Sequence, residues 1–190
     1  MNKKIAYQGR PGAYSHLVCI KAFPNYEPVP CESFEEVFKK TENKETEISL
    51  IPIENSQAGR VADIHNLLPM SNLVITGEYF HKVRHHLLGC PGSSLNSIKT
   101  AESHIHALAQ CKNFLSKNKI KPIISADTAG AAEEISKVKN NSRAAIASEL
   151  AAKIYNLTIL SSNIEDAIHN TTRFLFMKEN FEEVRMKDTD

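Results

Sequence analysis

A hydroxyl and a guanidinium side chain stand next to each other at Thr172 and Arg173, directly before the apolar run Phe174–Met177. Such a run predicts a buried strand, so both side chains are expected at its mouth. In α/β folds, ligands bind where strands end. A threonine hydroxyl donates a single hydrogen bond, whereas an arginine holds a carboxylate through two parallel N–H groups. The pair therefore predicts that the active site lies at this end of the molecule.

A second polar stretch, Glu54–Gly59, follows another predicted strand at residues 47–53. Glu54 comes after the apolar run without a spacer, so we expect it to be partly buried. A buried carboxylate needs a partner or keeps its proton more readily than one in water. The alternative is an ordinary turn, which Asn55 and Gly59 would suit.

Two predicted helix starts are further candidates for binding an anion. Gly9 and Gly12 lie in a turn that leads into a helix ending near Ala22. Ser103 is the expected N-cap of a helix that runs to Leu115, because serine side chains accept a bond from the first turn. Helix N-termini attract anions, although a tight turn and a plain cap explain both places equally well. Neither stretch carries a nucleotide-binding glycine pattern.

Three histidines, His81, His85 and His86, fall within six residues. Metal ligation is one interpretation. No carboxylate or cysteine completes a convincing ligand set at metal-binding spacing. Alternation along a strand, with some of the rings exposed, is the simpler interpretation, so we predict no metal.

Composition excludes several classes of function. The 190 residues carry 23 basic and 22 acidic side chains, a net charge of +1, which argues against nucleic-acid or membrane-surface binding. No apolar run approaches the roughly 20 residues of a membrane span. The four cysteines are widely separated, a pattern typical of reduced thiols in a cytoplasmic protein.

Strands and helices alternate along the chain, which predicts an α/β fold with mostly parallel sheets. The pattern divides into two lobes. We expect lobe 1 at about residues 1–77 plus 165–182 and lobe 2 at about residues 82–160. The last predicted strand, at 172–177, would return to lobe 1. Clefts between lobes are preferred small-molecule sites, so the active site is expected there.

Five motifs in this order resemble those of the prephenate dehydratase family. They are Gly9-x-Pro-Gly-Ala-Tyr-Ser-His16, Ile51-Pro-Ile-Glu-Asn-Ser-x-x-Gly59, Ser103-His-x-x-Ala-x-x-Gln-Cys111, Ala144-Ala-Ile-Ala-Ser148 and Asn163-Ile-x-Asp-x-x-x-Asn-x-Thr-Arg-Phe174. The resemblance covers the chain to Met177. It implies two α/β lobes of the periplasmic-binding-protein type II. It also implies conversion of prephenate, or alternatively arogenate, in phenylalanine biosynthesis without a metal or organic cofactor.

The resemblance also implies roles for individual residues. Thr172 would donate to the departing hydroxyl, with Glu54 as a proton reservoir if it is buried. Arg173 would clamp one carboxylate, and Ser103 with its helix start, or the Gly9–Gly12 turn, would hold the other. The expected catalytic residues are Thr172, Glu54, Asn55, Ser103 and Gln110. The expected substrate-binding residues are Arg173, Ser15, Ser56, Gly59, Phe174 and Asn170. The partner implied is a second copy of the chain, as a dimer or tetramer.

Two features depart from the family pattern. Ile105 and His106 stand where the family usually has proline and glutamine. The family also usually carries a C-terminal ACT domain that senses phenylalanine, and the residues after Met177 are too few to form one. Two other functions stay open: a solute-binding or effector-sensing module of the same architecture, and a histidine-ligated metal enzyme.

Overall fold

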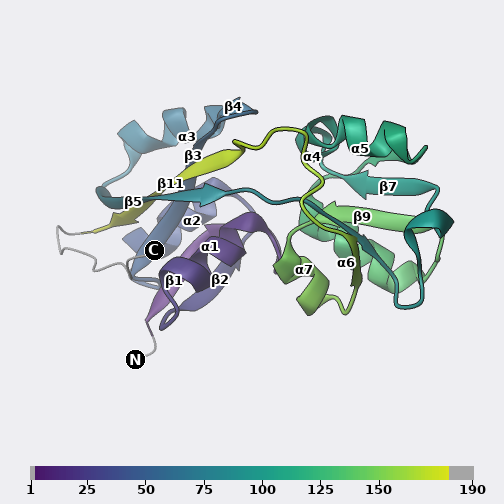
Figure 1. Ribbon diagram of the computed structural model, residues 1–190. Helices are drawn as coiled ribbons and strands as arrows, with labels where there is room; N and C mark the ends of the chain where they lie inside the picture. The colour runs from purple at the N-terminus through teal and green to yellow at the C-terminus, as the bar shows by residue number, and fades with distance from the viewer. Residues whose placement is uncertain (1–2, 180–190) are drawn as a thin grey trace. The chain divides into compact units, whose positions relative to one another are not determined.

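The computed structural model describes residues 3–179. The chain divides into two compact units (Figure 1). The described part of unit 1 covers residues 3–10, 14–82 and 171–179, and unit 2 covers residues 11–13 and 83–170. Among helices of the described chain, none is both long and apolar enough to cross a membrane.

Unit 1 is built on one twisted sheet with the strand order β2-β1-β3-β11-β5, to which β4 is added beside β3. Its strands are β1 (Lys4–Gln8), β2 (Glu27–Cys31), β3 (Ile48–Asn55), β4 (Gly59–Arg60), β5 (Val74–Lys82) and β11 (Thr171–Lys178). The last strand of the chain therefore lies inside this sheet, between β3 and β5, as the sequence predicted for a returning strand.

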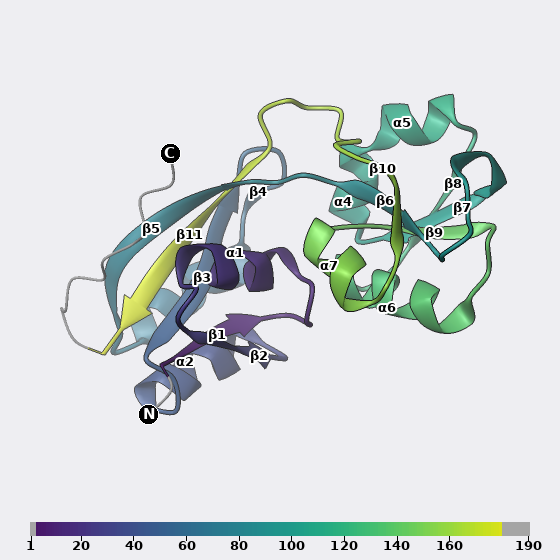
Figure 2. The same cartoon turned by 60° about the horizontal axis from the view of Figure 1, so that its bottom comes forward.

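Helices cover both faces of this sheet (Figure 2). They are α1 (Tyr14–Ala22), α2 (Phe34–Glu42), α3 (Ala62–Leu67) and the short 3-10 helix η1 (Leu68–Met70). Under α1 the sheet contributes Phe174 and Phe176 to one core. Under α2 and α3 it contributes Leu175 and Met177 to another. Alternate residues of β11 thus face opposite cores, as the period of two in a strand requires.

Unit 2 has a second sheet, with the order β10-β6-β9-β7-β8. Its strands are β6 (His86–Gly89), β7 (Thr100–Ser103), β8 (Lys121–Ile124), β9 (Arg143–Ala147) and β10 (Thr158–Ser161). Its helices are η2 (Leu95–Ser97), α4 (Ile105–Gln110), α5 (Lys112–Lys117), α6 (Thr128–Val138) and α7 (Glu149–Ile154). Figure 1 shows α4 and α5 on one face and α6 and α7 on the other.

The expectation of mostly parallel sheets is wrong, because both sheets are mixed. β1 is parallel to β2 and β3, and β7 is parallel to β8 and β9. β11 runs antiparallel to β3 and β5, and β6 runs antiparallel to β9 and β10. A helical crossover makes neighbouring strands parallel. β11 instead enters unit 1 directly from residue 170 of unit 2, and the alternation of elements does not reveal the direction of such a strand.

The predicted helix from Ser103 to Leu115 is interrupted and begins one residue later. His104 is the N-cap of α4 and accepts from the His106 N–H through its Nδ1 atom at 3.3 Å. The helix ends at Gln110, where Asp166 forms hydrogen bonds with the backbone of Gln110 and of Asn113. The Asp166 N–H donates to the Gln110 carbonyl at 2.7 Å, and the Asp166 carboxylate accepts from the Asn113 N–H, at the start of α5.

Other helix starts agree with the sequence. Ser33, Asp127 and Ser148 cap α2, α6 and α7 through side-chain oxygens, as their residue types predict. Unit 1 runs to Lys82, a little beyond the expected lobe end. Residues 165–170, which we expected in lobe 1, lie in unit 2. Residues 180–182 of that expected lobe lie outside the described residues.

Candidate active site

Thr172 and Arg173 point to opposite faces of the unit 1 sheet. Thr172 shares its face with Phe174, which is buried in the core beneath α1. Arg173 shares its face with Leu175, on the side of α2 and α3. The expected arrangement, in which both side chains act on one substrate at the strand mouth, therefore does not form. Consecutive residues of a regular strand cannot face the same side.

The Thr172 hydroxyl is held by Asn55. These residues lie directly opposite each other on β11 and β3, and Asn55 Nδ2 donates to Thr172 Oγ1 at 2.8 Å. The other end of the Asn55 amide is fixed as well. Its Oδ1 accepts from the N–H groups of Gln57 and Ala58, both at 2.9 Å. Because Asn55 supplies the hydrogen in the bond to Oγ1, the Thr172 hydroxyl proton is directed elsewhere.

His81 is the neighbour of Thr172 on its other side. It lies opposite Thr172 on β5, so both side chains are on the α1 face of the sheet. The His81 ring is buried, and its centroid lies 6.3 Å from that of Tyr14 in the first turn of α1. Sequence reasoning grouped His81 with the other two histidines and missed this place. Only the register of β11 against β5 reveals it.

Arg173 lies in a charged cluster on the opposite face. Its Nε and Nη2 atoms contact Glu78 Oε2 at 2.8 and 2.7 Å, and its Nη1 lies 3.4 Å from Glu54 Oε1. The guanidinium carbon is 5.9 Å from the centre of the Phe80 ring. The predicted carboxylate clamp beside Thr172 is thus replaced by an ion-pair cluster that bridges β3, β11 and β5.

Glu54 is not buried, contrary to the expectation from the sequence. Its side chain is 49% exposed and pairs with Arg173. A bulge in the pairing of β3 with β11 lies beside it, between Arg173 and Phe174. Glu54 therefore sits where the strand leaves the core, and the desolvation that a proton reservoir would need is missing.

Ser56 and Gly59 shape the loop that carries Asn55. Ser56 Oγ accepts from the Thr171 N–H at 3.0 Å, and the Ser56 N–H donates to the Thr171 carbonyl at 2.9 Å. Gly59 has a positive φ of 84°, which favours glycine, and pairs with Asn55 across a short hairpin. Ser56 fastens the loop to β11, and Gly59 closes the hairpin with β3; this explains their presence without contact to a ligand.

Three side chains of unit 2 form a buried amide and imidazole network. Gln110 Oε1 accepts from Asn170 Nδ2 at 2.8 Å and lies 2.7 Å from His85 Nε2. Asn170 is buried, and its carbonyl accepts from the Val83 N–H at 2.7 Å. Gln110 and Asn170, which the sequence predicted separately, are therefore direct partners.

Ser103 and Phe174 are both buried in the protein interior. Ser103 is fully buried in β7 and donates to the Ile146 carbonyl at 2.6 Å, so it neither caps α4 nor exposes its hydroxyl. Phe174 is almost fully buried in the unit 1 core and supports β11 from below. Ser15 lies partly exposed in the first turn of α1.

Gly12, at the end of the Gly9–Gly12 turn, is packed within unit 2. Gly12 has a φ of 91°, and a Cβ atom there would lie 2.9 Å from the Ala151 backbone. Its carbonyl accepts from Ser148 Oγ at 2.6 Å, and the Pro11 carbonyl accepts from the Tyr155 hydroxyl at 2.8 Å. These contacts account for the glycine without an anion.

The three histidines of the 81–86 stretch do not converge. His81 faces Thr172, and His85 contacts Gln110. His86 lies opposite Ala147 on β9. Within residues 3–179, no three histidine, cysteine, aspartate or glutamate side chains are placed to hold a metal ion together.

Comparison with known proteins decides the family. A family model described as prephenate dehydratase matches residues 5–182. The chain belongs to the prephenate dehydratase family.

Two relatives illustrate the range of this dehydratase family. A bifunctional N-acyl-homoserine lactone acylase/prephenate dehydratase of Komagataeibacter europaeus is 45% identical over 90% of this chain and 60% of its own length. An arogenate dehydratase/prephenate dehydratase of Arabidopsis thaliana, described as chloroplastic, is 44% identical over 92% of this chain and 46% of its own. The chain thus spans about half to three fifths of these relatives.

A solved prephenate dehydratase structure from Staphylococcus aureus has the same fold. It is 28% identical, matches with a TM-score of 0.82, and covers 94% of this chain and 67% of its own. The mixed α/β architecture described above is therefore that of prephenate dehydratase structures.

Proposed function

We propose that this chain converts prephenate into phenylpyruvate, carbon dioxide and water. The observation that carries the proposal is the Asn55–Thr172 hydrogen bond at the mouth of β11, in a chain of the prephenate dehydratase family. Asn55 donates in this bond, so the proton of the Thr172 hydroxyl is not used in it and can be donated to a substrate. A reaction that must release a hydroxyl group needs such a donor.

The reaction draws its driving force from the substrate. The bond between the ring carbon and its hydroxyl breaks, and the departing oxygen takes a proton to become water. The bond between the ring and its carboxylate breaks at the same stage, and its electron pair completes the aromatic ring as carbon dioxide leaves. Bond changes of this kind call for a hydrogen-bond donor at the leaving oxygen and for fixed donors at the carboxylates.

Thr172 is proposed as the donor to the leaving oxygen. A threonine hydroxyl is a very weak acid, so its contribution is to orient and relay a proton rather than to release one. Asn55 holds Oγ1 from one side, and His81 flanks the same face of the sheet. Preorganised donors of this kind act mainly in the transition state.

Neutral donors are proposed to hold the carboxylates. Gln110 exposes an amide nitrogen that has no hydrogen-bond partner among residues 3–179, and Ser15 lies at the start of α1. Arg173 is left out of this role because two carboxylates already surround it. Glu54 is left out as a proton reservoir because it is exposed.

The direct test is turnover. Purified protein mixed with prephenate is expected to form phenylpyruvate with EDTA present and no cofactor added. A mixture without protein measures the spontaneous reaction. Binding of prephenate without formation of phenylpyruvate above that control would overturn the proposal and favour a solute-binding module.

Arogenate is proposed as an alternative substrate. The Arabidopsis relative carries both substrates in its name, and the described site contains no feature that selects between the keto and amino side chains. With arogenate the product is phenylalanine, so the two reactions are measured separately. We also expect a homo-oligomer, which light scattering of the purified protein tests.

A further inference from the structure

We propose that His85 is a positioning residue that orients the Gln110 amide, so that its nitrogen is presented as a donor to the substrate. The inference rests on the proposed dehydratase function and adds a residue to it. His85 Nε2 lies 2.7 Å from Gln110 Oε1, the same oxygen that accepts from Asn170 Nδ2 at 2.8 Å.

The direction of the Gln110 amide follows from the count of donors. An amide oxygen has two lone pairs and only accepts. Asn170 fills one lone pair, and His85 must donate to the other through an Nε2–H group. With both lone pairs filled inside unit 2, the nitrogen of the amide faces the opposite way. In the part of the chain that the structure describes, this nitrogen has no hydrogen-bond partner.

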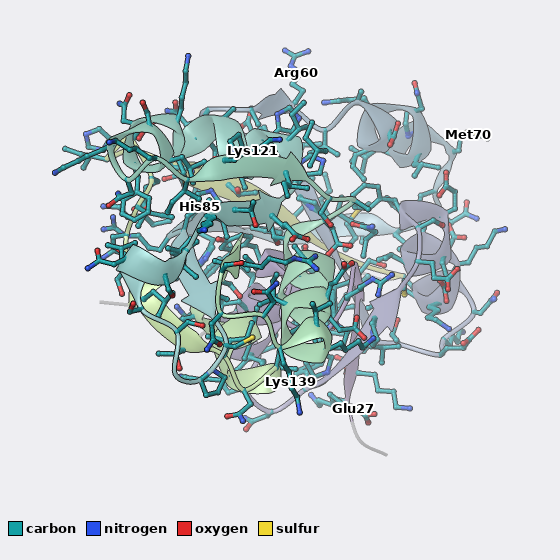
Figure 3. All side chains as sticks on the ribbon, turned by 90° about the vertical axis from the view of Figure 1, so that its right-hand side faces the viewer. Glu27, Arg60, Met70, His85, Lys121 and Lys139 are labelled. Atoms are coloured by element: carbon teal, nitrogen blue, oxygen red, sulfur yellow. The ribbon has the colours of Figure 1, made fainter. Side chains whose placement is uncertain are left out.

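His85 is itself held rigidly. Its backbone N–H donates to Glu165 Oε2 at 2.9 Å, and its backbone carbonyl accepts from the Ile164 N–H at 2.9 Å. Glu165 is nearly inaccessible and is fixed by Arg84 through a contact of 2.7 Å. Figure 3 shows His85 among the strands of unit 2, whereas Lys139 projects at the margin of the view. These bonds fix the backbone that carries the ring beside the Gln110 amide.

The surroundings keep the His85 ring neutral, with its proton on Nε2. The side chain is 3% exposed, and burial lowers the pKa of His85 below its ordinary value. The charged and titratable groups that act on it are Glu165 and His86, with Arg84 next along the chain. A neutral imidazole whose Nε2 carries the proton donates to Gln110 without placing a charge in the core.

Asn170, the other donor to Gln110 Oε1, is itself buried in unit 2. A displaced Gln110 amide would lower transition-state stabilisation more than it lowers folding stability.

The first experiment uses matched substitutions of neighbouring histidines. His85→Leu is expected to lower kcat/KM for prephenate about 10- to 100-fold, as misplacement of a contributing group does. His85→Gln, which keeps an N–H near the Nε2 position, is expected to recover most of the loss. His86→Leu is the control, because His86 is 7% exposed but lies opposite Ala147, which belongs to the core beneath α6 and α7. It should stay within about three-fold of wild type, the range of an uninvolved site.

A double-mutant cycle separates positioning from general packing. If His85 acts through Gln110, His85→Leu should cost less than about two-fold when Gln110 is already leucine. Equal losses in both backgrounds, or equal effects of His85→Leu and His86→Leu, would overturn the proposal. So would failure of His85→Gln to recover activity in a protein that melts like wild type.

A second measurement does not depend on turnover. The ¹⁵N signals of the His85 ring should report a proton on Nε2 in the wild-type protein and a changed tautomer balance in Gln110→Leu. A ring protonated on Nδ1 would contradict the geometry. If the wild type forms no phenylpyruvate, the proposed function fails, and the tautomer alone then decides whether His85 orients Gln110.

Discussion

The two faces of the sheet at the mouth of β11 differ in chemistry, although adjacent residues supply them. On one face, Thr172 lies between Asn55 and His81, and a neutral hydrogen bond of 2.8 Å sets the direction of its hydroxyl. On the other face, Arg173 lies between Glu54 and Glu78 in an exposed charged cluster. The same three strands carry both sets.

This difference separates orientation from charge. Exposed ion pairs are screened by water and salt and contribute little to stability. A hydroxyl held from one side by an amide, which is itself fixed by two backbone N–H groups, keeps one direction. We therefore assign the chemistry to the neutral face, and to the charged face the task of keeping β3, β11 and β5 together.

Loss of the Thr172 hydroxyl should have the largest effect. Thr172→Ala removes the donor to the leaving oxygen, and one well-placed donor typically contributes about 100- to 1,000-fold in kcat. KM should change little, because the interaction forms mainly in the transition state. Steady-state kinetics with prephenate measure both constants.

Thr172→Ser is the matched control. It keeps the hydroxyl and the bond to Asn55, so it should retain far more activity than Thr172→Ala. A kcat for Thr172→Ala within a few-fold of wild type, on folded protein, would remove Thr172 from the chemistry.

Replacing the amide donor of Asn55 by an acceptor should have the next largest effect on kcat. In Asn55→Asp, the carboxylate still accepts from Gln57 and Ala58, so the hairpin is kept, but no N–H remains for Thr172. The threonine hydroxyl would then donate to the carboxylate instead of to the substrate. We expect kcat to fall about 10- to 100-fold, with the melting temperature nearly unchanged. If kcat stays at the wild-type level, the direction of the hydroxyl is irrelevant.

Removing the cation of the charged face should lower activity less than the substitutions at Thr172 and Asn55. Arg173→Ala leaves Glu54 and Glu78 facing each other without a cation, and the mouth of β11 should loosen. We expect kcat/KM to fall about ten-fold or less, because the backbone ladder still holds the strands. Adding Glu78→Gln should recover part of the loss. A fall in Arg173→Ala as large as in Thr172→Ala would instead indicate direct contact with substrate.

The smallest expected effect is that of salt on the change in melting temperature caused by substitutions on the two faces. The difference in melting temperature between wild type and Arg173→Ala is expected to be a few degrees at low ionic strength. It should shrink as salt is added, because exposed pairs are screened. The difference between wild type and Asn55→Ala should not depend on salt. Thermal unfolding at two salt concentrations tests both, and an unchanged Arg173 difference would argue for a desolvated pair.

Sequence reasoning found most of the local structure. The caps at Ser33, Asp127 and Ser148 and the strand at 172–177 depend on neighbouring residues, so they are visible in the chain. The nearness of Gln110 to Asn170 was not predicted, since sixty residues separate them.

What the sequence could not show depends on strand direction and pairing. Thr172 and Arg173 are adjacent in the sequence, which suggested one shared site, but consecutive side chains of a strand point to opposite faces of the sheet. His81 becomes a neighbour of Thr172 only through the register of β11 with β5. Ser103 looked like a cap, but its hydroxyl donates to the Ile146 carbonyl on β9, and His104 caps α4 instead.

The interaction between Asn55 and Thr172 is the centre of this account, and a double-mutant cycle measures it directly. We would determine kcat for prephenate with wild type, Asn55→Ala, Thr172→Ala and the double variant, each shown to be folded. If Asn55 acts by directing the Thr172 hydroxyl, Asn55→Ala lowers kcat on its own but has almost no further effect once Thr172 is alanine. Losses that multiply independently in the double variant would contradict it.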